Sequence, residues 1–411
     1  MNYQPIYLNH DFQRSVLKPL INELDAPLFF YDLDFLKTHL ETGVTTCSQA
    51  GVRYLYACKA NGLSEILNCI RESGADFDVA SQGELEQALK SNVDPQQIIC
   101  TGPAKSARYL SMLLTRGIRT FILESEQQLN DLQSLCEERG IYAKALLRLQ
   151  LDWDKSQSSV LGGSSTTVFG LEDQHWIQVL KERTHTRIEI MGVHCFQWGN
   201  LVNLNDLKAT WQNVIERSAK FCQKASIQTK VVDLGGGLGI DYSSDQISEY
   251  SWHNIGDVLK HLSDQKIFDE VWIEPGRYSV GLCGAYMSRI IDRKRTRKKD
   301  FLILESGMNH LLRPALTQEG FPVKNLSEDG PKNTTFSIHG PLCTSLDWLG
   351  TAELPKNTSA DDILMFSKTG AYGFSESMPL FLAHQWPAEV CWINEQIKIQ
   401  RSAAPAQEFL K

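Results

Sequence analysis

The feature that most constrains this fold is a regular alternation of short apolar segments with longer helix-patterned segments, from about residue 33 to residue 274. Short apolar segments predict buried strands, and apolar residues at helical spacing predict the helices between them. The eight expected strands are Val52–Cys58, Asp76–Val79, Gln97–Cys100, Arg119–Ile122, Tyr142–Leu149, Arg187–His194, Thr229–Leu234 and Val271–Ile273. Eight such units in about 240 residues predict an α/β fold, a (β/α)8 barrel.

Local signals support the expected helices. One helix-patterned segment carries Leu63, Ile66, Leu67 and Ile70 and is followed by Gly74, a residue type that commonly ends helices. Ser81 followed by Glu84 predicts a capping box, which would open the next helix.

A second domain is expected outside the barrel, because 411 residues exceed one ordinary core and the pattern changes after Glu274. Leu28–Tyr31 is assigned to that domain. The other expected strands there are Tyr286–Ile291, Phe301–Leu304, Thr335–Ile338, Asp362–Phe366, Ala388–Trp392 and Gln396–Gln400. The barrel is thus expected at 33–274, and a mostly β C-terminal domain at 1–32 and 275–411. We expect Val323–Thr334 to be an exposed loop and the tail after Arg401 to be disordered.

Charge and composition exclude several functions. The net charge is −8, and the short basic run Arg289–Lys299 is interpreted as a solvated connection between strands, so nucleic-acid binding is not expected. Neither a signal peptide nor an apolar run of about 18 residues is visible, so no membrane association is expected. The ten cysteines lack paired spacing, which predicts no metal site, no disulfide framework and a reducing, cytoplasmic setting.

Lys59 closes an apolar strand-like segment, where a lysine is poorly placed for a core. An ε-amine partly removed from water loses affinity for its proton, and the neutral amine can form a Schiff base. The alternative is a lysine whose stem lies on the apolar surface while its amine reaches solvent.

Other unusual residues fall at the carboxyl ends of the expected strands, where barrels of this type place their sites. They are Asp78, His194, the run Gly235-Gly236-Gly237, and Glu274 with Gly276 and Arg277. Three glycines remove every Cβ from a loop, so its N–H groups can converge on an anion such as a phosphate. The alternative for the glycines is a flexible turn, and for Glu274 and Arg277 an internal salt bridge.

Two later segments also carry reactive side chains. Cys343, Thr344 and Asp347 place a thiol and a carboxylate in a turn-like segment, and Tyr372 is a phenol between glycines. The alternatives are a buried structural cysteine and a tyrosine packed at a domain boundary.

Taken together and in order, these segments resemble the alanine-racemase-like, fold-type III pyridoxal-phosphate decarboxylases, which include ornithine and diaminopimelate decarboxylases. The resemblance spans Phe30 to about Val390. It rests on the ordered motifs YACKAN, DVASQGEL, DLGGGLGI, EPGR, LRPAL, GPLCTSLD and GAYG.

The resemblance implies a role for each site residue. Lys59 would carry pyridoxal 5'-phosphate, Glu274 would bond its ring nitrogen, and Cys343 would return a proton after carbon dioxide leaves. The phosphate would be surrounded by Gly235, Gly236, Gly237, Gly276, Arg277 and Tyr372, with Asp78 and His194 also at the cofactor. In relatives the Cys343 segment comes from the partner subunit, so a homodimer with shared active sites is expected.

The chain departs from the diaminopimelate decarboxylase pattern at two places. In the segment His194–Asn200, Phe196 stands where a histidine usually stacks on the ring, and Trp198-Gly199 replaces Gly-Ser. Thr344 and Thr317 replace a glutamate and a tyrosine that serve diaminopimelate, which argues against that substrate. Arg313 could hold a carboxylate of the substrate and Asp347 an amine.

The sequence therefore predicts a decarboxylase acting on an amino acid or a conjugate, closest to the siderophore and secondary-metabolism branch, such as a citrate-linked diamino acid. Carrier-protein-bound amino acids are another substrate of that branch. The alternatives are a diaminopimelate or ornithine-type decarboxylase of primary metabolism, a racemase on the same fold, and a non-catalytic homologue that binds a partner protein.

Overall fold

The computed structural model describes residues 4–151, 167–182, 186–196, 198–247 and 250–409. Its contacts divide the chain into two compact units. The barrel unit is Leu40–Gly239 with Glu249–Gly276, and the β-rich unit is Met1–His39 and Ile240–Ser248 with Arg277–Lys411. Residues 33–39 and 240–248 thus belong to the β-rich unit in this division, whereas the sequence placed them in the barrel.

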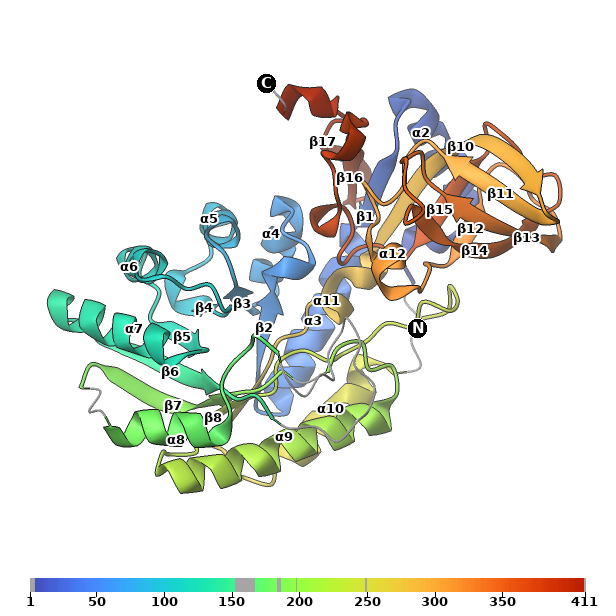
Figure 1. Cartoon of the computed structure of the whole chain (residues 1–411). Helices are drawn as coiled ribbons and strands as arrows, with labels where there is room; N and C mark the ends of the chain where they lie inside the picture. Colours follow the sequence, from blue (N-terminus) through green and yellow to red (C-terminus); the bar gives the residue numbers. More distant parts are fainter. Residues whose placement is uncertain (1–3, 152–166, 183–185, 197, 248–249, 410–411) are drawn as a thin grey trace. The chain divides into compact units, whose positions relative to one another are not determined.

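The barrel unit contains a closed parallel sheet of eight strands, as predicted (Figure 1). Closure is made by pairing of the first strand with the last, Tyr54 opposite Ile273. The strands are β2 (Val52–Ala57), β3 (Asp76–Val79), β4 (Ile98–Cys100), β5 (Thr120–Leu123), β6 (Ala143–Arg148), β7 (Ile188–His194), β8 (Val231–Asp233) and β9 (Glu270–Ile273). A buried cluster with one residue from most of these strands fills the barrel: Leu55, Ile99, Ile122, Leu146, Met191, Val231 and Trp272.

Helices follow most strands and lie outside the barrel (Figure 1). They are α4 (Ser64–Glu72), α5 (Gln82–Lys90), α6 (Ala107–Thr115), α7 (Glu126–Arg139), α8 (Asp173–Glu182), α9 (Leu204–Ala225) and α10 (Trp252–Ser263), with α3 (Leu33–Gln49) before the first barrel strand. Gly74 follows α4 at φ +83°, which confirms the predicted helix end. Ser81 caps α5 by accepting from the Glu84 N–H, while the Glu84 carboxylate accepts from the Ala80 N–H.

The β-rich unit is a sheet in the order β14-β13-β11-β10-β1-β16-β17, with β15 joining β10 to β12. Its strands are β1 (Leu28–Asp32), β10 (Gly284–Thr296), β11 (Lys299–Leu304), β12 (Val323–Asn325), β13 (Lys332–His339), β14 (Trp348–Pro355), β15 (Ile363–Ser367), β16 (Ala388–Ile393) and β17 (Gln396–Arg401). Its helices are α1 (His10–Phe12), α2 (Lys18–Leu24), α11 (Arg277–Val280) and α12 (Arg313–Thr317). As expected, β1 belongs to this unit, where it is buried along its length between β10 and β16.

Three predictions about the β-rich unit were wrong. The expected loop Val323–Thr334 contains β12, which pairs with β15, and the polar start of β13, which pairs with β14. Most of the basic run Arg289–Lys299 lies within β10, and only Arg297 and Lys298, both with positive φ, turn the chain into β11. The tail after Arg401 is ordered through Phe409, since Ala404 pairs with Trp386 and a 3-10 helix, η8, covers Ala406–Phe409.

A buried lysine holds the segment that begins at Ile240 within the β-rich unit. Lys368 is 1% exposed, and its Nζ donates to the backbone oxygens of Asp241, at 2.7 Å, and Gln246, at 2.6 Å. Two direct bonds to backbone fix this segment more firmly than a surface ion pair would.

Within the described ranges, none of the helices combines the length and the apolar character needed to cross a membrane.

Candidate active site

The carboxyl ends of the barrel strands bring together the residues that the sequence singled out. Lys59 lies in η3 (Cys58–Ala60) directly after β2, and its Nζ is 3.7 Å from Oδ2 of Asp78 at the end of β3. The Lys59 side chain is 48% exposed, so it is only partly removed from water. The Lys59 amine has a charged neighbour, the buried Asp78 carboxyl.

Asp78 is a buried carboxyl held by a second residue. Its Oδ1 accepts a 2.7 Å hydrogen bond from Thr101, and its side chain is 1% exposed. Burial raises the pKa of Asp78 to about 7, helped by the charge of Glu274 and opposed by Lys59 and Thr101. Asp78 can therefore exchange a proton near neutral pH.

Three acidic and basic groups meet beneath the strand ends. The ligand atoms of His194, Asp233 and Glu274 lie within 4.8 Å of one another, and all three side chains are buried. His194 Nε2 is 3.5 Å from Glu274 Oε2. Burial opposes the charge of Glu274, but His194, Lys59 and Arg148 outweigh it and lower the pKa of Glu274 to about 2. Among the described residues, Oε1 of Glu274 has no hydrogen-bond partner.

The glycine run forms a loop with no room for side chains. Gly235 and Gly237 have φ of +64° and +113°, a region that favours glycine. A Cβ on Gly235 would lie 2.8 Å from Cβ of Phe196, and one on Gly236 would lie 3.1 Å from the Glu274 backbone oxygen. Phe196 therefore packs against the loop. Gly276 is equally confined, because a Cβ there would lie 3.1 Å from Cβ of Ala60.

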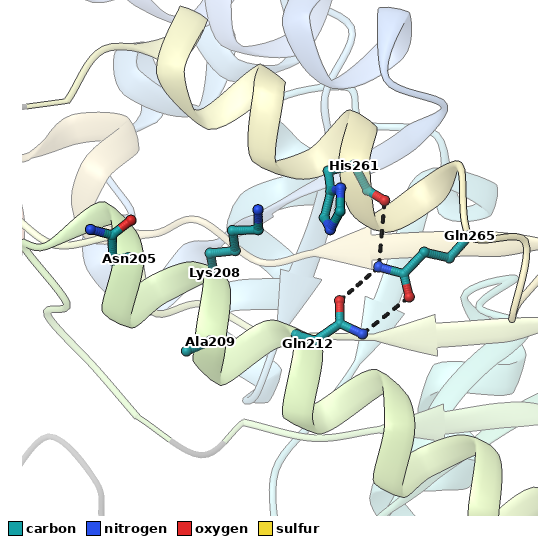
Figure 2. A pocket seen from close by; sticks show the side chains of 6 residues that line it. All are labelled: Asn205, Lys208, Ala209, Gln212, His261 and Gln265. Carbon is teal, nitrogen blue, oxygen red and sulfur yellow. Dashed lines mark hydrogen bonds between the residues drawn. The ribbon is translucent and has the colours of Figure 1, made fainter.

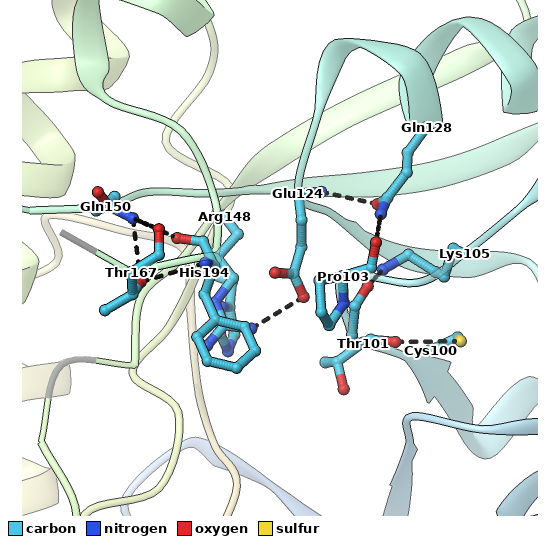
Figure 3. Close-up of polar contacts among 12 residues, drawn as sticks. Cys100, Thr101, Pro103, Lys105, Glu124, Gln128, Arg148, Gln150, Thr167 and His194 are labelled. Atoms are coloured by element: carbon cyan, nitrogen blue, oxygen red, sulfur yellow. Dashed lines mark hydrogen bonds and ion pairs between the residues drawn. The ribbon is translucent and has the colours of Figure 1, made fainter. Parts of the chain in front are cut away.

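A buried ion pair at the ends of β5 and β6 was missed by the sequence analysis. Arg148 Nη1 donates to Glu124 Oε1 at 2.9 Å, as Figure 3 shows. Burial is the main cause that lowers the pKa of His194, and Arg148 adds to it. Arg148 and Glu124 each follow apolar strand residues, a signal as clear as the one that identified Lys59 and Asp78.

Within the β-rich unit, a tyrosine outside the expected set contacts two arginines. Arg277 opens α11, donates to the Tyr242 hydroxyl at 3.0 Å, and places its guanidinium 4.6 Å from the centre of the Tyr372 ring. The Arg313 guanidinium lies 5.2 Å from the centre of the Tyr242 ring. Tyr242 lies in the segment held by Lys368, so both arginines share one anchored ring.

The buried guanidinium of Arg313 has a nitrogen without a hydrogen-bond partner among the described residues. The Arg313 side chain is 4% exposed, and that nitrogen, Nη2, lies 3.5 Å from Glu319 Oε2. A buried guanidinium N–H without an acceptor is costly, which favours an anionic ligand at this place.

The three predicted residues in the segment after β13 differ in exposure and in hydrogen bonding. Cys343 is exposed, whereas the other nine cysteines are buried, so the alternative of a buried structural cysteine is wrong. Thr344 accepts a 3.2 Å bond from the Leu346 N–H through its hydroxyl. Asp347 is buried and accepts from the N–H groups of Met308 and Leu342, both at 2.7 Å. These backbone bonds give Asp347 a structural role and do not support the predicted contact with a substrate amine.

A separate groove lies on the outside of the barrel unit, between α9 and α10. Its volume is about 470 Å³, and Figure 2 shows its polar lining of Asn205, Lys208, Gln212, His261 and Gln265 with Ala209. Gln212 and Gln265 bond each other across it. None of the residues discussed above lines this groove.

Comparison with known proteins decides the family. Residues 40–281, more than half of the chain, match the model for the pyridoxal-binding domain of the pyridoxal-dependent decarboxylases. The chain belongs to the pyridoxal-dependent decarboxylase family. It is accordingly a carboxy-lyase that uses pyridoxal phosphate, and the predicted fold-type III barrel with a mostly β second domain is confirmed.

Individual relatives of this decarboxylase are distant but cover nearly its whole length. A diaminopimelate decarboxylase of Aquifex aeolicus is 27% identical, covering 94% of this chain and 91% of its own. An L-glutamyl-[BtrI acyl-carrier protein] decarboxylase of Niallia circulans is 24% identical, covering 97% and 96%. The crystal structure of diaminopimelate decarboxylase from Helicobacter pylori complexed with L-lysine matches with a TM-score of 0.84 at 23% identity, covering 95% and 98%.

The barrel unit of the decarboxylase has groups that fit this cofactor. The buried Oε1 of Glu274 is available to a ring N–H, and the glycine loop offers a surface without Cβ atoms to a phosphate. When bound, pyridoxal phosphate supplies an electron sink for the charge left by departing carbon dioxide. The close group of His194, Asp233 and Glu274 is thereby explained by an organic cofactor, and we assign no metal to it.

Proposed function

We propose that the enzyme decarboxylates an amino-acid conjugate carrying a further carboxylate, such as a citrate-linked diamino acid of siderophore assembly. Two observations together carry this proposal: the buried Arg313 Nη2 has no hydrogen-bond partner among the described residues, and Thr344 offers a hydroxyl where a distal ammonium would need a carboxylate. A site rejects a substrate whose charged group would be left without a partner.

The same proposal assigns roles to the chain's own residues. Lys59 carries the cofactor, Glu274 bonds its ring nitrogen, and Cys343 Sγ delivers the proton that replaces carbon dioxide. The glycine loop, Arg277 and Tyr372 bind the phosphate. The supporting geometry is the exposed thiol of Cys343, the orphan oxygen of Glu274 and the close stacking of Arg277 on Tyr372.

Three cofactor residues have a less specific assignment. We propose that Asp78 contacts the cofactor while it pairs with Lys59, and that His194 and Phe196 pack beside the ring. His194 contacts Glu274, and Phe196 lies against the glycine loop, so both are near groups that the cofactor would touch.

A homodimer with shared active sites, in the cytoplasm, completes the proposal. An exposed Cys343 on a turn suits a residue delivered to a second subunit, and ten cysteines without paired spacing suit a reducing compartment. The substrate is a small molecule or a small group on a carrier protein.

The alternative is decarboxylation of free diaminopimelate or ornithine. It is favoured by the names of relatives such as the diaminopimelate decarboxylases of Aquifex aeolicus and Campylobacter jejuni. The relative acting on a glutamyl group of an acyl-carrier protein instead supports a conjugated substrate.

Release of carbon dioxide from a panel of substrates separates the two. The panel contains meso-diaminopimelate, ornithine, a citrate-linked diamino acid and a carrier-protein-bound glutamyl group. We expect kcat/KM for a conjugate to exceed that for diaminopimelate by about 100-fold or more. Higher kcat/KM for free diaminopimelate would overturn the proposal.

A matched variant tests the reason for the preference. Thr344→Glu restores a carboxylate and should raise activity on diaminopimelate, while Ser345→Glu, one residue away, should not. Equal effects of the two substitutions would show that position 344 does not contact the substrate.

A further inference from the structure

Asp233 is a buried carboxyl that the sequence analysis did not single out. It ends β8, is 0% exposed, and its Oδ1 accepts the N–H of Gly235 at 2.9 Å. This bond to the residue two positions ahead is an Asx turn, and it sets the direction in which the glycine run begins. Its other oxygen, Oδ2, is buried without a hydrogen-bond partner among the described residues.

The neighbouring strand presents a second carboxyl with an orphan oxygen. Glu274 follows β9, which pairs in parallel with β8, and its N–H donates to the Gly235 oxygen at 2.8 Å. Gly235 is thus bonded both to the Asp233 side chain and to the Glu274 backbone. Asp233 and Glu274 also have ligand atoms within 4.8 Å of each other.

Two carboxyls so close in a buried place cannot both carry a charge, because no water screens their repulsion. A single proton held by one of them removes the repulsion and allows a hydrogen bond between the two carboxyls. Glu274 has three groups that favour its ionised form, His194, Lys59 and Arg148, so Asp233 is the partner that keeps the proton.

The surroundings of Asp233 agree with this assignment. Glu274 faces it from β9, His194 and Cys195 from the end of β7, and Asp78 acts on it from β3. Burial, and then the charge of Glu274, raise the pKa of Asp233 well above its ordinary value. No cation contacts Asp233 among the described residues.

We propose that Asp233 is a positioning residue that donates one retained proton to Glu274 while its second oxygen fixes the Gly235 N–H. A single side chain would then orient the group that bonds the ring nitrogen and the loop that binds the phosphate. The proposal rests on the assigned cofactor but not on any particular substrate.

The test measures binding of pyridoxal phosphate to protein freed of cofactor, by absorbance and fluorescence titration without substrate. Asp233→Asn keeps an oxygen for Gly235 and an N–H for Glu274, so its dissociation constant should stay within about threefold of wild type. Asp233→Ala loses both bonds and should bind about tenfold or more weakly. Because neither measurement involves a substrate, failure of the substrate proposal would leave both results unchanged.

Two outcomes would overturn the proposal. If Asp233→Asn binds as weakly as Asp233→Ala, a charge at this position is required and the retained proton is wrong. If Asp233→Ala binds as well as wild type, the side chain positions nothing. Thermal unfolding of the cofactor-free variants accompanies each titration, and Asp233→Asn remains informative if Asp233→Ala fails to fold.

A double-mutant cycle separates positioning from general structural support. Asp233→Ala combined with Glu274→Gln should cost much less than the sum of the single changes, because the bond between them can be lost only once. Additive losses in cofactor affinity would exclude the link to Glu274. The pH at which the absorption of bound cofactor changes should also move in Asp233→Ala and stay in place in Asp233→Asn.

Discussion

At the scale of single residues, the hydroxyl of Tyr242 bonds Arg277, whereas its ring lies against both Arg313 and, at 5.9 Å, Arg277. Substitutions that remove the hydroxyl alone or the whole ring can therefore separate the two functions.

Tyr242→Phe should weaken binding of pyridoxal phosphate to the cofactor-free protein by about 3- to 10-fold, because Arg277 loses one hydrogen bond. The KM of the substrate should stay unchanged, because the ring beneath Arg313 remains. Tyr142→Phe is the matched control, since Tyr142 is an exposed tyrosine whose ring also contacts an arginine, Arg187. A change in KM without a change in cofactor affinity would contradict this assignment.

Asp78 predicts a pH dependence of stability. Its pKa is raised by burial to about 7 in the folded protein, whereas an unfolded chain has its ordinary lower value. The folded state thus prefers the protonated form, so this residue's contribution to stability falls as the pH rises toward 7. Asp78→Asn does not titrate and should gain stability relative to wild type from pH 5 to pH 8, by on the order of 2 kcal/mol.

Urea unfolding of the cofactor-free proteins at several pH values measures this difference. Thr101→Val removes a bond that favours the ionised carboxyl, so it should move the transition to higher pH. A stability difference between Asp78→Asn and wild type that is constant with pH would refute the prediction.

At the scale of elements, the glycine loop needs glycine for two reasons, a positive φ and the lack of space for a Cβ, and the two can be measured separately. Gly235 and Gly51 have nearly the same φ, +64° and +69°, so alanine should strain both backbones by about 1 kcal/mol. At Gly51 nothing lies within 4 Å of the added Cβ, whereas at Gly235 it meets Phe196 at 2.8 Å.

Gly235→Ala should therefore destabilise the protein more than Gly51→Ala and should also weaken cofactor binding by about tenfold or more. Gly51→Ala should leave cofactor binding unchanged. Chemical unfolding and cofactor titration give the two quantities, and equal cofactor affinities in both variants would show that the loop does not bind the phosphate.

The elements also show what sequence can predict here. The barrel strands carry short apolar or alternating segments and most are followed by a helix, so strands such as β3 were predicted at their observed bounds. In contrast, β14 was missed because its Gly350, Glu353 and Pro355 are poor strand formers, and its strand conformation depends on pairing with β13. Tyr242 could not be found, because its segment is held by bonds from Lys368 to backbone oxygens, which leave no mark in a sequence pattern.

Site residues divide in the same way. Lys59, Asp78, His194 and Glu274 end strands of one parallel barrel, so their meeting follows from topology alone. The backbone bonds of Asp347 could not be read from the sequence, because a carboxylate in a turn can serve backbone N–H groups as readily as a ligand.

At the scale of the whole molecule, the proposed shared active sites predict complementation between two inactive variants. Lys59→Ala and Cys343→Ala proteins should each be nearly inactive. If each site takes Lys59 from one subunit and Cys343 from the other, mixed dimers hold one intact site, and reassociated mixtures should recover about a quarter of wild-type activity. Sedimentation confirms that dimers form, and a mixture that stays inactive after subunit exchange would exclude shared sites.

The position of β1 has a consequence for synthesis of the protein. This strand, Leu28–Asp32, is made near the start of translation, yet its parallel partner β16 is completed only at Ile393. Until then the edge of β1 that pairs with β16, in the aromatic segment Phe29-Phe30-Tyr31, has no partner strand on the nascent chain. An exposed strand edge of this kind promotes aggregation. A premature stop shortly before Ala388 would therefore yield an insoluble product, even though every residue assigned to the chemistry would already have been translated.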